Sequence, residues 1–291
     1  MKARLGIIGG SGLYDLPGLT DRREETITSP WGEPSAKVSF GRIGETQIAF
    51  LPRHGLGHRL SPSGINYRAN IDVLKRAGVT DLVSFSAVGS YKEDLPPGMF
   101  ILPDQILDRT FRRETSFFSN GCVAHVPFGH PVGPALAKRV AMAAAKAEVA
   151  IRQGGTAVCM EGPQFSTLAE SLSYKRQGYD VIGMTSMPEA KLAREAEITY
   201  CLVAMVTDFD CWHPHHDQVT AQMVIEQVQH NSIAAKKLIA ALAADFPPER
   251  EPCPVGSHRA LDGAIMTVPS ARDPALMAKL DAVAGRILRQ T

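Results

Sequence analysis

Two carboxylates, Asp208 and Asp210, stand two residues apart directly after an apolar run at 200–207. The run predicts a buried strand, and residues two apart face the same side while the chain stays extended. Such a pair could bind a metal, act as acid and base, or read the edge of a purine. The stretch 211–217 adds three histidines. A proline interrupts them and the helical spacing of zinc motifs is missing, so we expect a loop or lid and no metal.

A glycine-rich turn at 6–12 could hold an anion, because it follows a predicted strand and offers backbone N–H groups and the hydroxyl of Ser11. A dinucleotide-binding turn is disfavoured. Counted from Gly10, the third glycine position of that pattern holds Asp15, and Pro17 stops any long helix. A tight turn without a ligand stays open as the alternative.

Two more strand ends offer groups that could bind an anion. Arg53 follows the run 47–52 and presents a planar fork that matches an oxyanion, and His54 could add a donor. The run 84–90 ends in small residues with N–H groups and hydroxyls. Because α/β proteins place ligands at the carboxyl edge of the sheet, we predict one shared anion site there. A surface pair of Arg53 and His54 is the alternative.

Two strand-to-helix turns could complete a site for a flat ligand. In 159–167, Phe165 could stack on a ring or act as a hydrophobic staple for the following helix. In 183–189, Thr185 could donate to an anion. We assign Glu189 to the first turn of a helix, where acidic side chains are favoured.

These motifs lie on an alternation of short apolar runs and amphipathic runs. Predicted strands cover 3–8, 37–43, 47–52, 81–87, 99–106, 155–160, 180–185 and 200–207, and predicted helices cover 63–77, 134–148, 167–177, 188–197, 219–244 and 273–290. The alternation predicts an α/β fold with a largely parallel sheet. We expect a single domain, 1–291, in which a proline-rich loop at 246–258 leads to a C-terminal helix.

The composition narrows the class of protein. The chain has 291 residues, 44% of them hydrophobic, and a net charge of +1. This balance gives no electrostatic footprint for nucleic acid or a membrane surface. Apolar runs reach about ten residues, short of the ~20 that span a bilayer. Five scattered cysteines without a CxxC motif, and the lack of a signal-peptide pattern, predict a reduced cytoplasmic protein.

Taken together and in order, the motifs resemble the trimeric purine nucleoside phosphorylase family. The resemblance covers roughly residues 5–240 and rests on the stretches 9–13, 53–55, 66–71, 87–90, 161–166, 184–185 and 207–212. It implies a single-domain α/β fold with a mixed, mostly parallel sheet flanked by helices, a homotrimer, no metal and no bound cofactor. Inorganic phosphate would be a co-substrate. The implied partners are small molecules, with no nucleic acid and no membrane.

The resemblance also implies roles for individual residues by their motif positions. Phosphate would be held by Ser11, Arg53, His54, Ser86, Ala87 and Thr185. The nucleoside would contact Met184 at the ribose, Phe165 and Ser166 at the purine, and Asp208 and Asp210 at the base edge. The 5′ pocket would be lined by Val219, Val224 and Ile225, and by His125 lent from a neighbouring subunit. The expected catalytic residues are Asp208, Ser11 and His54.

The chemistry that this resemblance implies is phosphorolysis, in which phosphate attacks the anomeric carbon while the purine leaves. Asp208 is the candidate proton carrier for the leaving purine. A carboxylate pair accepts from a 6-amino group, which favours adenine over 6-oxopurines, and Val224 and Ile225 favour a thioether at the 5′ end. The expected reaction converts 5′-methylthioadenosine to adenine and 5-methylthioribose 1-phosphate.

Three alternatives stay open. A 6-oxopurine nucleoside or methylthioinosine phosphorylase could use the same scaffold, because base choice depends on few contacts. A nucleoside-binding protein without turnover is a second alternative, since a fold does not dictate function. A dinucleotide oxidoreductase is the most distant, because the glycine fingerprint fails.

Overall fold

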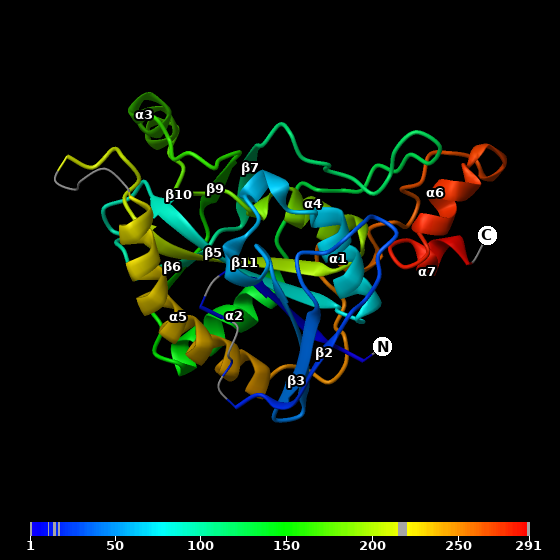
Figure 1. Ribbon diagram of the computed structural model, residues 1–291, viewed down its shortest axis with the longest axis horizontal. Helices are drawn as coiled ribbons and strands as arrows, with labels where there is room; N and C mark the ends of the chain where they lie inside the picture. The colour runs from blue at the N-terminus through cyan, green and yellow to red at the C-terminus, as the bar shows by residue number, and fades with distance from the viewer. Residues whose placement is uncertain (1, 11, 14–15, 17, 215–219, 290–291) are drawn as a thin grey trace.

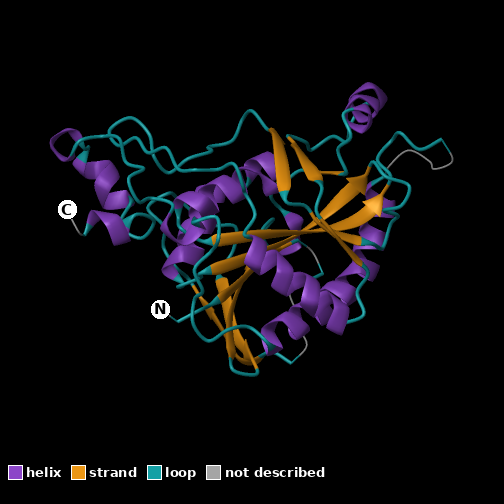
Figure 2. Ribbon diagram, turned by 180° about the vertical axis from the view of Figure 1, so that it is seen from behind, coloured by secondary structure: helices purple, strands orange, loops and turns teal. Residues whose placement is uncertain are grey.

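A computed structural model describes residues 2–10, 12–13, 16, 18–214 and 220–289 of the chain. Eleven strands of this described part form one sheet, and helices cover it on both sides (Figure 1 and Figure 2). Its middle consists of β4 (Thr46–Pro52), β1 (Leu5–Gly9), β5 (Asp81–Ser90) and β11 (Thr199–Asp208), which pair in parallel. Parallel pairing brings the carboxyl ends of these strands to one edge, where the polar motifs follow.

Further strands extend the sheet at both sides. Beyond β4, β3 (Val38–Ile43) and β2 (Thr20–Glu25) continue it in antiparallel pairing. Beyond β5, β10 (Val181–Gly183) pairs antiparallel with β5 and parallel with β9 (Thr156–Met160), which pairs parallel with β7 (Gln105–Arg109). The predicted α/β class with a mixed, mostly parallel sheet is confirmed.

The strand predictions are wrong in two places. The expected strand 99–106 is two strands, β6 (Phe100–Leu102) and β7, because Pro103 between them lacks the N–H needed to continue a ladder. β6 instead pairs with β11 and with β8 (Ile151–Gln153). The sequence pattern did not indicate β2 or β8, because β2 is exposed at every position and β8 has only three residues.

Helices cover both faces of the sheet. Those on one face are α1 (Tyr67–Arg76) and α4 (Ser186–Glu195), and those on the other are α2 (Pro134–Lys146) and α5 (Ala221–Ala244). Successive residues of β11 alternate between two hydrophobic clusters: Leu202 and Ala204 join α1 and α4, whereas Cys201 and Val203 join α2 and α5. The period of two in a strand therefore explains why β11 is apolar at consecutive positions.

The predicted helices agree with the structure within a few residues, except at the C-terminus. The expected helix 273–290 is two short helices, α6 (Pro274–Lys279) and α7 (Gly285–Leu288). The chain turns between them, and this turn buries Leu280, Val283 and Ala284 in the cluster that also holds α1 and α4. The segment after the loop 246–258 thus packs on the same face as α1, and the domain extent 1–291 stays a prediction.

Two general properties bear on the environment of the protein. Within the described ranges, no helix has both the length and the apolar character needed to cross a bilayer. The structure describes all five cysteines, and they are free thiols, four of them buried.

One buried carboxylate near the end of α4 gives a pH-dependent prediction. Burial raises the pKa of Glu195 to about 7, against hydrogen bonds from Ser116 Oγ and Phe117 N. The folded protein therefore binds a proton that the unfolded chain releases, and stability falls as the pH rises from about 4.5 to about 7. Glu195→Gln removes this titration. As the pH rises over that range, the free energy of unfolding of the variant should therefore increase relative to that of wild type.

The expected shift between pH 4.5 and pH 8 is roughly 2–3 kcal/mol, at about 1.4 kcal/mol per pKa unit. Urea denaturation of wild type and Glu195→Gln at both pH values measures it. Glu45→Gln is the control, because the Glu45 side chain is 96% exposed and should show no such shift. Parallel pH curves for wild type and Glu195→Gln would contradict the prediction.

Candidate active site

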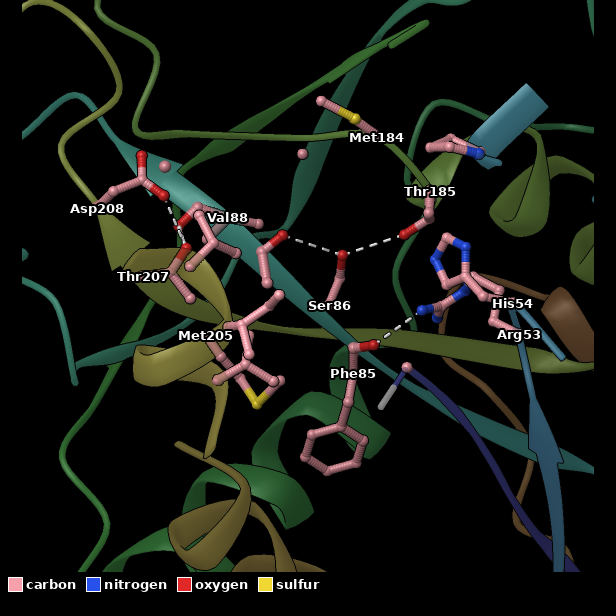
Figure 3. A pocket seen from close by; sticks show the side chains of 18 of the residues that line it. Arg53, His54, Phe85, Ser86, Val88, Met184, Thr185, Met205, Thr207 and Asp208 are labelled. Carbon is pink, nitrogen blue, oxygen red and sulfur yellow. Dashed lines mark hydrogen bonds between the residues drawn. The ribbon is translucent and has the colours of Figure 1, made fainter. Parts of the chain in front are cut away.

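A cavity of about 550 Å³ opens at the carboxyl ends of the central strands (Figure 3). Its walls come from the ends of β4, β5, β9, β10 and β11 and from the first half of α5. Predicted site residues that line it are Arg53, His54, Ser86, Ala87, Phe165, Met184, Thr185, Asp208, Asp210, Val224 and Ile225. Ser11 and Val219 lie outside the described residues. The separate motifs of the sequence therefore meet in one cavity.

Hydroxyl groups gather at one end of the cavity. Ser86 Oγ, from β5, and Thr185 Oγ1, just after β10, lie 3.1 Å apart, and both residues are buried. The glycine-rich turn also reaches this end, since Gly10 and Gly12 line the cavity on either side of position 11. Gly12 has a φ of +99°, a backbone conformation that favours glycine. Small residues and hydroxyls of this kind can surround an oxyanion with donors.

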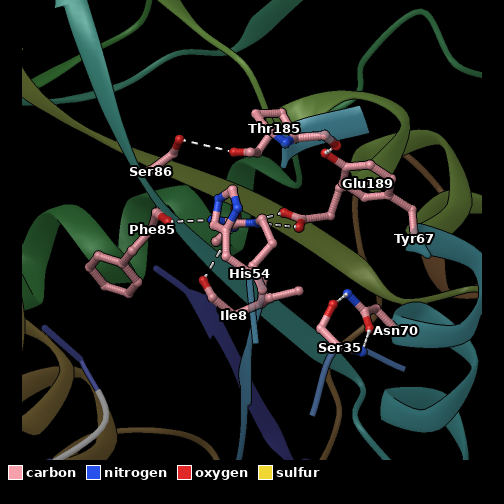
Figure 4. Close-up of polar contacts among 12 residues, drawn as sticks. Ile8, Ser35, His54, Tyr67, Asn70, Phe85, Ser86, Thr185 and Glu189 are labelled. Carbon is pink, nitrogen blue, oxygen red and sulfur yellow. Dashed lines mark hydrogen bonds and ion pairs between the residues drawn. The ribbon is translucent and has the colours of Figure 1, made fainter. Parts of the chain in front are cut away.

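Arg53 lies buried beneath this end (Figure 3), and most of its donors are used inside the protein. Figure 4 shows Glu189, the carboxylate that pairs with it. Its Nε donates to Glu189 Oε2 at 2.8 Å and its Nη2 to Glu189 Oε1 at 3.2 Å. Nη1 donates to the Phe85 carbonyl oxygen at 2.9 Å. Burial opposes the charge of Arg53, but Glu189 raises the pKa of the guanidinium. Arg53 thus stays charged, and Glu189 matches its charge. Within the described residues Nη1 donates only to Phe85, so its second hydrogen has no partner there.

Glu189 is the main residue that sequence reasoning undervalued. It lies in the first turn of α4 as predicted, but its side chain is fully buried and also accepts a hydrogen bond from Tyr200 Oη at 3.0 Å. The preference for acidic side chains at helix starts predicted the position of Glu189 in α4 and did not predict its ion pair with Arg53.

His54 differs from the expected donor. Burial and the charge of Arg53 lower the pKa of His54 to about 4, so the ring is neutral at neutral pH. Its Nδ1 lies 2.9 Å from the Leu60 carbonyl oxygen, which can only accept, so Nδ1 carries the hydrogen. The remaining nitrogen, Nε2, is then an acceptor. The single N–H of the neutral ring is thus used by Leu60, and donation by His54 to an anion would require the protonated ring.

The two carboxylates lie at the other end of the cavity. Asp208 Oδ2 accepts from Thr207 Oγ1 at 2.7 Å, and Oδ1 accepts from the Asp210 N–H at 2.8 Å. Burial and the nearby Asp210 charge raise the pKa of Asp208, against those hydrogen bonds. Burial also raises the pKa of Asp210, against the nearby hydroxyls of Ser171, Tyr91 and Ser166, which lower it. None of the described residues makes a hydrogen bond of ordinary geometry with its buried Oδ2. Both groups are thus poised to take up a proton or a ligand donor.

The backbone brings these carboxylates together by a route that the sequence did not predict. The chain does not stay extended, because the β5–β11 pairing shifts register between Val206 and Asp208, and Asp210 has a φ of +50°. Gly89 of β5 makes room for this turn, since a Cβ there would lie 2.8 Å from Asp208 Oδ1.

The structure speaks against the staple role considered for Phe165, and its stacking on a ring stays a prediction. Thr167 is the N-cap of α3 (Leu168–Arg176), so Ser166 holds the position before the cap that a staple residue would need. Phe165 instead lines the cavity with its side chain 42% exposed. Ser166 is not among the lining residues, and its hydroxyl lies 3.7 Å from Met160 Sδ.

Apolar side chains form the wall between the two ends. Met184 packs against the turn after β9 so closely that a Cβ at Gly162 would lie 2.5 Å from its Sδ. Along α5, the apolar Val224, Ile225 and Val228 and the polar Gln229 form one stripe that also lines the cavity. Val228 and Gln229 were not predicted. They follow Val224 and Ile225 by four residues, a helical spacing that could have indicated them.

His125 is the predicted site residue that the chain does not bring to its own cavity. It is exposed and does not line the cavity. Its N–H donates to the Ala264 carbonyl oxygen, and the segment around it runs beside 264–266 toward α6 (Figure 1).

Residues 4–244 match the family described as the phosphorylase superfamily. The chain belongs to the phosphorylase superfamily. It is 67% identical over 288 residues to S-methyl-5′-thioadenosine phosphorylase of Bradyrhizobium diazoefficiens, across 99% of each chain. This confirms the resemblance drawn from the motifs.

Two solved structures resemble this member of the superfamily. Methylthioadenosine phosphorylase from an Antarctic soil metagenomic library is 44% identical, with a TM-score of 0.91 over 97% of this chain and 99% of that one. The Schistosoma mansoni methylthioadenosine phosphorylase in complex with adenine is 33% identical, with a TM-score of 0.83 over 91% of this chain and 99% of that one.

Proposed function

We propose that the protein cleaves 5′-methylthioadenosine with inorganic phosphate to give adenine and 5-methylthioribose 1-phosphate. The observation that carries the proposal is the layout of the cavity. Hydroxyls and Arg53 lie at one end, two protonatable carboxylates at the other, and an apolar wall between them. Relatives that align with nearly the whole chain bear the name of this enzyme.

In this proposal the first end holds phosphate for attack on the anomeric carbon. The phosphate oxygens are held by Ser86, Ala87 and Thr185, by the turn with Ser11 and by the second Nη1 hydrogen of Arg53. His54 Nε2 accepts the hydrogen of HPO₄²⁻. The C1′–N9 bond breaks as a bond from phosphate oxygen to C1′ forms, and Met184 covers the ribose. Holding both reactants in line can remove about 7–11 kcal/mol of the barrier.

The second end serves the leaving base. Asp208, whose raised pKa favours the protonated form, donates to the purine N7 as negative charge develops there. Asp210 accepts from the 6-amino group, and Phe165 borders the ring. The proton balance closes over one turnover, because the sugar phosphate loses the hydrogen of HPO₄²⁻ to solvent and Asp208 regains a proton from solvent. HPO₄²⁻ and the neutral nucleoside thus give a sugar phosphate dianion and neutral adenine. No cofactor and no metal are needed for this exchange.

The apolar side chains of α5 support a thioether at the 5′ end, with Val224 and Ile225 as the contacts. A 5′-hydroxyl would lose its hydrogen bonds against such a wall.

We further propose a cytoplasmic homotrimer in which His125 completes the 5′ pocket of a neighbouring subunit. Three apolar side chains around His125 are exposed in the single chain: Val123 by 40%, Met266 by 63% and Val268 by 60%. Contiguous exposed apolar groups favour an interface. Light scattering would test the trimer, and a monomer with full activity would contradict it. The five free thiols fit a reducing compartment.

The experiment that tests the function measures base release from methylthioadenosine, adenosine, methylthioinosine and inosine, each with and without phosphate. We expect phosphate-dependent release that is fastest from methylthioadenosine. Preference for the two inosine substrates would overturn the role of the carboxylates and keep the phosphate end. No release from any substrate, with tight nucleoside binding, would favour a binding protein.

A further inference from the structure

Arg113 is a buried arginine outside the residues that line the cavity. It lies in the segment that follows β7, and its side chain is 1% exposed. Its Nη1 donates to the carbonyl oxygens of Met184 at 2.7 Å and Met187 at 2.6 Å. Its Nη2 donates to the carbonyl oxygen of Glu161 at 2.7 Å. One guanidinium therefore joins the backbone that follows β10 to the backbone that follows β9.

The two joined turns carry opposite parts of the cavity. The turn after β9 supplies Pro163 and Phe165, and the turn after β10 supplies Met184 and Thr185. The turns also touch directly, through the contact between Met184 Sδ and Gly162. The separation of the two turns thus sets how Thr185 lies relative to Phe165, at the two ends where phosphate and purine would bind.

Glu161 holds the guanidinium in place. Its Oε1 lies 3.3 Å from Arg113 Nε, and its Oε2 accepts from the Phe111 N–H at 2.7 Å. Burial opposes the charge of Glu161, but hydrogen bonds from Ser63 and Phe111 and the charge of Arg113 lower its pKa to about 2. Glu161 is therefore ionised. The planar fork of arginine supplies directed donors that a lysine ammonium cannot reproduce.

We propose that Arg113 is a positioning residue for phosphorolysis: it fixes the turn that carries Met184 and Thr185 against the turn that carries Phe165. This inference rests on the proposed function. Reacting groups must lie within about 3–3.5 Å in line, and a displacement of about 1 Å can cost ~10²-fold in rate. The turnover rate should therefore depend on Arg113 although its side chain does not reach the ligand space.

The main test is Arg113→Lys, which keeps the charge beside Glu161. We expect kcat for methylthioadenosine to fall about 10–100-fold, with a much smaller change in the KM of the nucleoside. Arg250→Lys is the matched control. Arg250 Nη2 also donates to two backbone carbonyls, of Thr80 and Glu197, but at the amino ends of β5 and β11. Its kcat should stay within about 2-fold of wild type. A kcat for Arg113→Lys equal to that of Arg250→Lys would overturn the inference.

Chemical rescue gives a readout that a general loss of stability would not move. Added guanidinium at millimolar concentration should raise the kcat of Arg113→Ala several-fold and leave Arg250→Ala unchanged. Rescue of neither variant would count against the positioning role. If the Arg113 variants do not fold, Glu161→Gln replaces them, because it keeps Arg113 and the shape of the Glu161 side chain. It should lower kcat, and an unchanged kcat in this variant would also overturn the inference.

Wild type in the same assay separates the two proposals. Release of adenine by wild type supports the proposed function whatever the Arg113 variants do. If wild type releases none, the proposed function fails and this inference fails with it.

Discussion

Asp208→Asn is expected to lower kcat/KM for methylthioadenosine by about 10²–10⁴-fold, because the amide cannot give a proton to the leaving purine. Burial and the Asp210 charge raise the pKa of Asp208, which suits a proton donor, and Thr207 and the Asp210 N–H fix its orientation. An asparagine also presents an N–H₂ donor, which suits a 6-oxo group. The ratio of inosine-type to adenosine-type turnover should therefore rise even as the absolute rate falls.

Steady-state base release from the four nucleosides measures both effects. Asp94→Asn is the control for the loss of one carboxylate, since the Asp94 side chain is 78% exposed and does not line the cavity. Unchanged preference for the 6-amino substrates in Asp208→Asn would mean that another group reads the base edge.

Glu189→Gln is expected to lower the free energy of unfolding by about 3–5 kcal/mol, because it leaves the buried guanidinium of Arg53 without its counter-charge. The pair is bidentate and both side chains are at most 1% exposed. The glutamine also has only one acceptor oxygen, which Arg53 and Tyr200 would have to share. Arg53 should then shift beneath the phosphate end, so the KM for phosphate should rise as well.

Urea denaturation at neutral pH measures the change in stability. The matched control is Glu251→Gln, which breaks an Arg–Glu pair at 2.5 Å whose side chains are 32% and 54% exposed. That change should cost less than about 1 kcal/mol. Equal losses for the two variants would show that burial of the Arg53–Glu189 pair contributes nothing.

The sequence predicted the fold class and most strands because the central strands have a strong local signal, with apolar residues at consecutive positions. It could not predict β2, which is exposed throughout and pairs with β3 at the edge of the sheet. Local patterns were also enough to find the strand-end motifs, since small and polar residues after an apolar run are typical of ligand sites in α/β folds.

Interactions between distant parts of the chain explain what was missed. Arg53 and Glu189 are 136 residues apart, and neither residue alone indicates that the other matches its charge. The hydrogen on His54 Nδ1 is likewise decided by the backbone of Leu60, a partner that no sequence motif reveals. The role of His125 in a neighbouring subunit rests on the resemblance and stays a prediction.

The charge matching at the phosphate end has a consequence for how salt affects the protein. Arg53 is paired with Glu189 and His54 is neutral, so recognition of the anion by these residues depends on directed hydrogen bonds rather than on a net positive field. Dissolved ions screen long-range fields over roughly 8–10 Å and leave buried short contacts almost untouched. The affinity for phosphate should therefore change little with ionic strength, unlike that of an exposed cluster of lysines.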